Sequence, residues 1–197
     1  MKMKQILAIV LSMVLVACIS VTATLAYLTS TDSVENTFTI GNVVITLDEA
    51  PVDTDGKEIE GDRVRANTYK LLPGHDYDKD PTIHVDADSE DCWLFVEITN
   101  EIAAIEDDVT IADQMTDNDW TPIAEGSNIY YHADIAKADD DVVVFETFKV
   151  KGDVENDELA DYAGKTVVIK AYAIQADGFD TAVAAWTAAG AEAQAKQ

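Results

Sequence analysis

The chain has 197 residues, of which 38 are acidic and 13 are basic, so its formal net charge at pH 7 is −25. A surface this negative repels nucleic acid and anionic lipid, which excludes both as binding partners. The acidic residues are interleaved with apolar ones, so the composition indicates a folded protein and not a disordered acidic tail.

Residues 1–26 have the pattern of a secretory signal peptide. Two lysines precede a nearly continuous apolar run over 6–21, and the small residues Thr24 and Ala26 stand three and one positions before a cut ahead of Tyr27. A membrane-spanning helix needs about 20 apolar residues, whereas this run is slightly shorter and is diluted by hydroxyl side chains. We therefore expect cleavage after Ala26, secretion, and contact with the membrane only through this segment before the cut.

An alternative cut lies before Cys18. Residues 15–18 read LVAC, the pattern of a lipobox, in which Cys18 is lipidated and becomes the first residue of the mature chain. The residues that follow, 19–28, stay largely apolar, whereas a tethered lipoprotein usually has a polar, flexible leader. Lipidation at Cys18 is therefore the alternative to cleavage after Ala26.

Residues 27–197 are long enough for one domain with its own core, and no linker or repeat divides them. They hold 11 basic and 38 acidic residues, for a net charge of −27. Cys92 is the one cysteine among them, so the fold cannot depend on an internal disulfide. Because Cys92 lies in an apolar run, we expect it to be buried.

Apolar residues of the mature chain recur mostly at every second position, which predicts strands. We expect eight strands, over 43–48, 68–72, 83–86, 92–99, 120–124, 128–133, 142–151 and 167–174. Strands of this number with irregular links are typical of an all-β protein, namely an antiparallel β-sandwich of the jelly-roll kind.

Three other stretches have helical character. The acidic intervals 101–115 and 153–162 are predicted to hold short helical turns. The Ala-rich segment 181–196 is predicted to form a C-terminal helix that packs on the sandwich.

Acidic loops supply the carboxylates that hard cations prefer. They lie in 76–80, 86–91 and 139–141, and the calcium candidates among them are Asp76, Asp78, Asp80, Asp86, Asp88 and Asp91. None of these loops follows the EF-hand spacing, and acidic loops on an acidic protein are usually just solvated. We expect no cofactor, with calcium as the one candidate.

Catalytic motifs are missing from the sequence. The three histidines, His75, His84 and His132, form no H-E-x-x-H motif, and no two of them stand four residues apart. There is also no G-x-S-x-G motif and no phosphate-binding glycine loop. We therefore expect no catalytic residues and no enzyme activity.

Three segments are informative in combination. They are ATLAYLTSTDSVENTFTIGNV at 23–43, KLLPGHDYDKDPTIHVDADSEDCWLFVEI at 70–98 and VVIKAYAIQADGFDTAVAAW at 167–186. Together they resemble the TasA/camelysin group of secreted Gram-positive proteins, whose signal peptides are cut by a SipW-type peptidase. The first segment is the most specific, with its alanine exit and N-T-F-x-x-G-N-V leading into a strand.

The resemblance implies a jelly-roll β-sandwich at the cell surface or in the biofilm matrix, where some members assemble into fibres. In such fibres the N-terminal segment of one subunit completes the sheet of its neighbour. The donor segment here would be 27–40, with the apolar plugs Tyr27, Leu28, Val34, Phe38 and Ile40. In the alternative, this segment pairs within its own subunit as an ordinary first strand.

Camelysin-like proteins are also catalogued as metallopeptidases, so a secreted metalloendopeptidase is one alternative function. A monomeric, calcium-dependent binding domain is another. The missing catalytic motifs favour a secreted structural protein that associates with itself, with the SipW-type signal peptidase as its processing partner.

Overall fold

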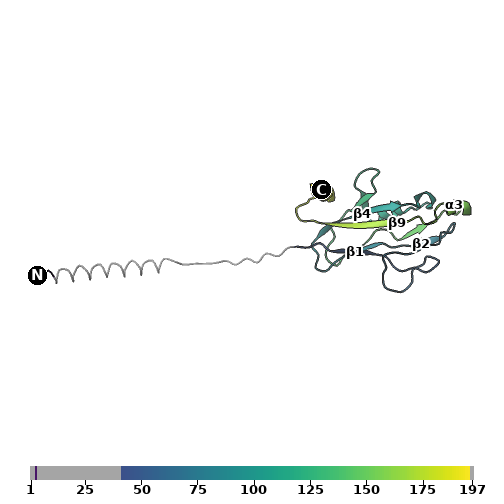
Figure 1. Ribbon diagram of the computed structural model, residues 1–197, viewed down its shortest axis with the longest axis horizontal. Coiled ribbons are helices and arrows are strands. Elements are labelled where there is room, and N and C mark those ends of the chain that lie inside the picture. The colour runs from purple at the N-terminus through teal and green to yellow at the C-terminus, as the bar shows by residue number, and fades with distance from the viewer. Residues whose placement is uncertain (1–2, 4–40, 196–197) are drawn as a thin grey trace. The chain divides into compact units, whose positions relative to one another are not determined.

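The computed structural model describes residue 3 and residues 41–195. Residues 41–197 form a unit of their own, and its described part consists mostly of antiparallel strands with few helices (Figure 1). The prediction of an antiparallel, all-β protein is therefore confirmed at the level of class. Within this part of the chain, none of the helices combines the length and the hydrophobicity that a membrane crossing requires.

The strands of the described residues form three sheets. The first has the order β1-β3-β7, with β1 at Ile45–Asp48, β3 at Thr82–Val85 and β7 at Asp141–Val143. The second has the order β5-β6-β4-β9, with β5 at Trp120–Pro122, β6 at Ile129–His132, β4 at Cys92–Asn100 and β9 at Val167–Gln175. The third pairs β2, Asp76–Asp78, with β8, Thr147–Lys149.

Within residues 41–195, four helical segments connect or cover the sheets. They are the 3-10 turn η1 at Ala103–Ile105, α2 at Ile111–Asp117, α3 at Asn156–Ala160 and α4 at Ala182–Ala195. A capping box begins α2, because the Thr110 side chain accepts from the Asp113 N–H while the Asp113 carboxylate accepts from the Thr110 N–H. α4 lies within the range 181–196 that was predicted as a helix.

β4 is apolar on both faces and is buried on both. Its residues alternate between two directions, so that Leu94 and Val96 face the main core while Trp93 and Phe95 face a smaller one. β9 pairs with β4 along its whole length, from Cys92 opposite Gln175 to Asn100 opposite Val167.

The main core lies between the first two sheets. β3 contributes Ile83 and Val85, β4 contributes Leu94, Val96 and Ile98, and further buried side chains are Tyr77, Trp120, Phe145 and Phe148. In Figure 1, β4 and β9 lie in the upper layer of the domain, and β1 and β2 lie in the lower one.

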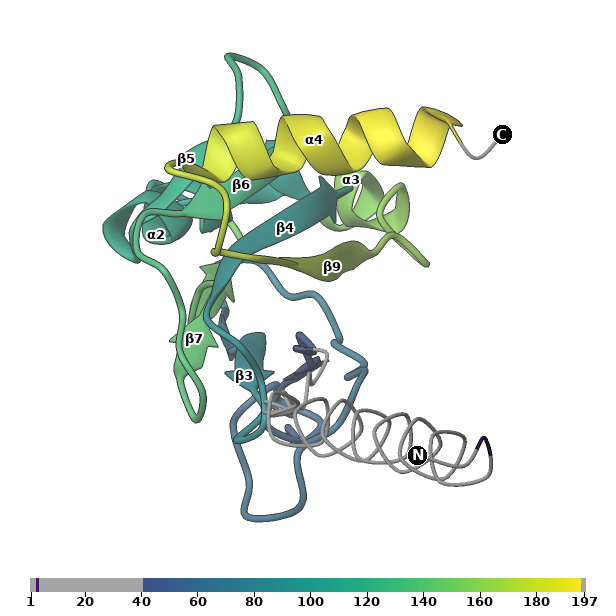
Figure 2. The same ribbon diagram turned by 90° about the vertical axis from the view of Figure 1, so that its left-hand side faces the viewer.

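α4 covers the smaller core on the outer face of the second sheet (Figure 2). Its buried residues Ala182 and Ala185 and the partly buried Trp186 pack against Trp93 and Phe95, and the ring centroids of Trp186 and Phe95 are 4.9 Å apart. The helix therefore protects the apolar outer face of β4 from water.

Three details of the strand prediction are wrong. Residues 68–72 form no strand, because their backbone is held by a side chain: the Tyr77 hydroxyl accepts from the Leu72 N–H at 2.7 Å and donates to the Lys70 carbonyl at 2.6 Å. The strand expected over 142–151 is split into β7 and β8, since the consecutive buried residues Val144 and Phe145 interrupt the alternation. β2, in turn, lies in a segment that was expected to be a loop.

Candidate functional site

One edge of β9 has no strand partner within residues 41–195. On β4, the Ile98 N–H donates to the Asn128 carbonyl at 2.9 Å, so the backbone groups of the even-numbered residues of β4 point toward β6 and those of the odd-numbered residues point toward β9. Because the backbone groups of a strand alternate in direction, the partners of β4 on β9 are its even-numbered residues. The N–H and C=O groups of the other residues point to the open edge: Val167, Ile169, Ala171 and Ala173.

One edge of β1 likewise has no strand partner among the described residues. The Asp86 N–H donates to the Val44 carbonyl at 3.0 Å, so the even-numbered residues face β3, and Ile45 and Leu47 direct their backbone groups outward. The open stretch ends at Glu49, which exchanges two hydrogen bonds of 2.8 Å with Val64.

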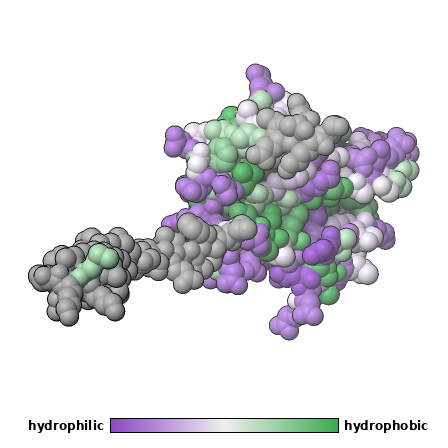
Figure 3. Space-filling view, turned by 60° about the vertical axis from the view of Figure 1, so that its left-hand side comes forward, coloured by the Kyte–Doolittle hydropathy of each residue, from purple (hydrophilic) through white to green (hydrophobic). Residues whose placement is uncertain are grey.

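The side chains along both open edges face the main core but are only partly buried. They are Val43, Ile45, Leu47, Val167, Ile169, Ala171 and Ala173. On β4, by contrast, Leu94 and Val96 are fully buried. The core is therefore incompletely covered along this side. On the face drawn in Figure 3, apolar surface gathers in a band across the middle of the domain, between polar margins.

A cavity of about 830 Å³ joins the end of β1 to the beginning of β9, and we call it the groove. Its walls come from residues 47–49, from residues 65–69 and 71 of the irregular segment that precedes β2, and from residues 159 and 162–169 at the end of α3 and the beginning of β9. Apolar side chains in these walls include Leu47, Tyr69, Leu71, Tyr162, Val167 and Ile169. A site of this size and lining suits a drug-sized molecule or an apolar stretch of extended chain.

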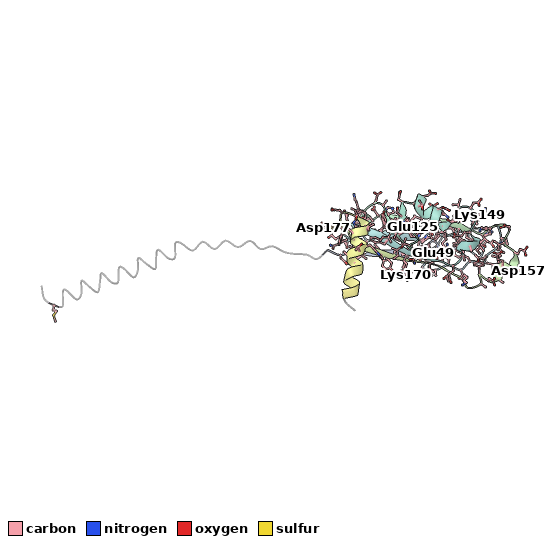
Figure 4. All side chains as sticks on the ribbon, turned by 90° about the horizontal axis from the view of Figure 1, so that it is seen from above. Glu49, Glu125, Lys149, Asp157, Lys170 and Asp177 are labelled. Atoms are coloured by element: carbon pink, nitrogen blue, oxygen red, sulfur yellow. The ribbon has the colours of Figure 1, made fainter. Side chains whose placement is uncertain are left out.

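The floor of the groove holds a buried ion pair between Lys79 and Glu49. The Lys79 ammonium also lies 5.9 Å from the centroid of the Tyr69 ring. Burial, followed by the nearby charge of Glu49, raises the pKa of Tyr69 well above its usual value, so its hydroxyl stays neutral and donates to the Asp78 carbonyl at 3.0 Å. In the view of Figure 4, Glu49 lies between Asp157 and Asp177, which mark the two ends of the domain.

Beside the groove, an ion-pair network ties together the three strands of the first sheet. His84 on β3 lies between two carboxylates, with Nε2 at 2.9 Å from Asp48 Oδ1 on β1 and Nδ1 at 2.5 Å from Asp141 Oδ1 on β7. Arg63 binds Asp48 as well, and its Nη1 donates to Asp80 at 2.8 Å. Partial burial lowers the pKa of His84, but its hydrogen bonds to Asp141 and Asp48 outweigh this and hold the pKa above its ordinary value.

The calcium candidates of the 76–80 segment are engaged by cations and backbone groups. Asp76 and Asp78 both contact the Lys57 ammonium, at 3.3 and 3.0 Å. Asp80 binds Arg63 and accepts from the Ala50 N–H at 2.6 Å.

The candidates of the 86–91 loop, Asp86, Asp88 and Asp91, are exposed, and Asp86 accepts from the Asp88 N–H at 3.0 Å. Among the residues that the structure describes, no group of three or more His, Cys, Asp or Glu side chains could hold a metal ion.

The histidines do not converge, and each has its own partners. His75 Nε2 lies 2.7 Å from the Asp55 carbonyl, and His132 packs against the Trp120 ring. The prediction that Cys92 is buried is confirmed. Burial, followed by the charges of Asp91 and Asp140, raises the pKa of its thiol to about 11, which makes it a poor nucleophile at neutral pH.

Several predicted site residues lie outside the described part of the chain. They are Thr24 and Ala26 of the cleavage site, the lipidation candidate Cys18, and the donor-segment residues Tyr27, Leu28, Val34, Phe38 and Ile40. The residues of the groove, conversely, were not singled out from the sequence. Nothing in the local pattern of β1 or β9 says which of its edges lacks a partner.

Comparisons of this chain with protein-family models, with curated proteins and with solved structures find no match.

Proposed function

We propose that this protein is a secreted subunit of a cell-surface or biofilm-matrix fibre of the TasA/camelysin type. In this proposal a SipW-type peptidase cuts after Ala26, and residues 27–40 of one copy complete the fold of the next. The domain that receives them is a β-sandwich of the jelly-roll kind. The observation that carries the proposal is the open edge, where the same residues of β1 and β9 have half-buried core side chains and backbone groups with no strand partner within residues 41–195.

An added strand would satisfy both deficiencies of this edge. Its backbone would pair with the outward N–H and C=O groups, and its apolar side chains would cover the exposed flank of the core. The groove at the end of β1 has a volume of about 830 Å³, which leaves room for such side chains, and its walls are largely apolar.

Residues 27–40 have the pattern that this role requires. The apolar residues Leu28, Val34, Phe38 and Ile40 are all at even-numbered positions, which also hold Ser, Asp and Asn, while the odd-numbered positions from 29 to 39 hold only Thr, Ser and Glu. A strand whose apolar side chains all lie on one face presents them together to a core, while its opposite face meets water. Of the plugs predicted from the sequence, Tyr27 alone falls on the polar face.

The length of the segment and the symmetry of the exchange fit a filament. Fourteen extended residues span about 45 Å, which is comparable to the diameter of a domain of this size. Head-to-tail donation of a strand does not close on itself, so it produces open filaments.

The experiment is electron microscopy and size-exclusion chromatography of the purified secreted protein. We expect filaments from the wild-type chain and none from Val34→Asp/Phe38→Asp, which places charge on the apolar face. The matched control is Thr37→Asp/Thr39→Asp, which changes the charge equally on the polar face and leaves filaments intact.

Two results contradict the proposal. One is a wild-type protein that stays monomeric and is destabilised by Val34→Asp/Phe38→Asp, which indicates that the segment pairs within its own subunit. The other is a filament that forms equally well with both double variants.

A further inference from the structure

The rim of the groove carries charge of the opposite sign to the protein as a whole. Arg65 and Lys165 line it from two different segments. Within residues 41–195, Arg65 has no carboxylate partner in ion-pair contact, and Lys165 has one weak contact of 3.4 Å with Glu101, both side chains being substantially exposed.

The other charges of the groove are already compensated. Glu49 and Lys79 pair with each other on the floor, and the Asp48 carboxylate is engaged by Arg63 and His84. Two cationic side chains thus stand at the groove of a chain whose net charge is −25, and of these Lys165 is only weakly paired, with Glu101.

The opposite end of β1 is acidic. The loop 86–91 lies there, since the Asp86 N–H donates to the Val44 carbonyl at 3.0 Å and the Glu90 N–H donates to the Asn42 carbonyl at 2.9 Å. This loop carries Asp86, Asp88, Glu90 and Asp91. The open edge of β1 thus runs from an acidic end, near Asn42, to a cationic end, at Leu47–Glu49.

Charge is unevenly distributed along the proposed donor segment. Its charged residues are Asp32 and Glu35, and both precede the main apolar anchors Phe38 and Ile40. If Asp32 and Glu35 lie at the cationic end, Phe38 and Ile40 lie beside Ile45. The incoming strand then runs antiparallel to β1. The reverse direction places Asp32 and Glu35 beside the acidic loop, where like charges repel.

We infer that Arg65 and Lys165 form an electrostatic clasp for Asp32 and Glu35 of a second copy of this chain, and that the clasp sets the direction of the incoming strand. The inference rests on the proposed function. Exposed charge pairs of this kind act mainly on the rate and the orientation of association, and salt screens them.

The test is a charge swap in the full chain, with assembly followed by light scattering. In 50 mM NaCl we expect Arg65→Glu/Lys165→Glu to slow assembly on the order of tenfold, and Asp32→Lys/Glu35→Lys to do the same. Combining all four changes restores the rate to within about threefold of wild type, because the attraction is re-formed with reversed signs. In 1 M NaCl, where the screening length is about 3 Å, the differences disappear.

The matched control is Lys70→Glu/Lys137→Glu, which changes the net charge equally at exposed positions that do not line the groove. It should alter the rate by less than about twofold if local charge decides the effect. Thermal melting of each variant confirms that the fold is intact.

Cross-linking tests the direction. Copies carrying Glu35→Cys, mixed with copies carrying Lys165→Cys, should form a mixed disulfide on oxidation. Glu35→Cys and Asp88→Cys should not, because the proposed direction places these two positions at opposite ends of β1, too far apart for a disulfide. The native Cys92 is buried and does not interfere.

The clasp, its direction and the fibre proposal are contradicted by different results. Filaments that form at an unchanged rate in Arg65→Glu/Lys165→Glu, or that are not restored by the fourfold swap, overturn the clasp and leave the fibre proposal standing. A mixed disulfide to Asp88→Cys overturns the direction. A wild-type protein that never assembles overturns the fibre proposal and the clasp together.

Discussion

At the scale of single residues, charged groups hold the floor and flank of the groove in place. The buried pair of Lys79 and Glu49 fixes the backbone at the end of β1, and removing one partner of such a pair leaves an uncompensated buried charge. Beside the groove, His84 holds two strands together, because it contacts Asp48 on β1 and Asp141 on β7.

The His84 contacts predict a pH dependence of stability. Since the pKa of His84 is raised in the folded protein, its stabilising contribution is fully present below the unfolded pKa of about 6.5 and is lost as the pH rises through the folded pKa. The groups that face it are Asp141, Asp48 and, through Asp48, Arg63.

We expect the urea midpoint of the wild-type protein to fall between pH 5.5 and 8.5 by more than that of His84→Gln. Equal changes for the two proteins would show that His84 is not coupled to folding. The comparison removes the contributions of the other two histidines, which both proteins share.

At the scale of elements, the sequence predicts those strands that are long and alternate without interruption. The nine residues of β4 and of β9 have this pattern, and both strands lie where they were expected. Residues 68–72 were wrongly predicted as a strand because their backbone bonds to the Tyr77 side chain, at Lys70 and at Leu72, and no local pattern reveals this. β2 was missed because its residues Asp76 and Asp78 read as a loop, yet the buried Tyr77 between them anchors the strand to the core.

The turn at 53–57, whose Gly56 carbonyl accepts from the Asp78 N–H of β2 at 2.8 Å, offers a prediction at this scale. Gly56 has φ of +73°, and a Cβ there would lie 2.4 Å from Cδ1 of the buried Tyr77 ring. Gly126 has the same φ of +73°, but a Cβ there meets nothing within 4 Å. Gly126→Ala therefore isolates the cost of the left-handed backbone, about 1–2 kcal/mol, while Gly56→Ala adds a steric clash in the core.

We expect Gly56→Ala to lower the free energy of unfolding by at least about 1 kcal/mol more than Gly126→Ala, as overpacking of a core usually does. Urea denaturation of the two variants measures the difference. Equal losses would mean that Tyr77 moves aside at no cost, and that the turn does not constrain β2.

At the scale of the whole molecule, the proposed donor and the proposed acceptor were not equally visible in the sequence. Residues 27–40 could be proposed as a donor strand because alternation and the signal pattern are local properties. The acceptor edge could not, because β1 and β9 are far apart in the chain and pair with different strands. Which edge of a strand stays open depends on every other pairing in the domain, and only the assembled fold contains that information.

The most direct test of the proposed assembly is hydrogen–deuterium exchange at the open edge of β9. We expect the amides of Val167, Ile169, Ala171 and Ala173 to exchange rapidly in the monomer and to become protected in filaments, while the amides of Lys170 and Tyr172, which point toward β4, are protected in both states. Amides of Val167, Ile169, Ala171 and Ala173 that are already protected in the monomer, or that still exchange rapidly in filaments, would contradict the proposal that a second copy completes this edge.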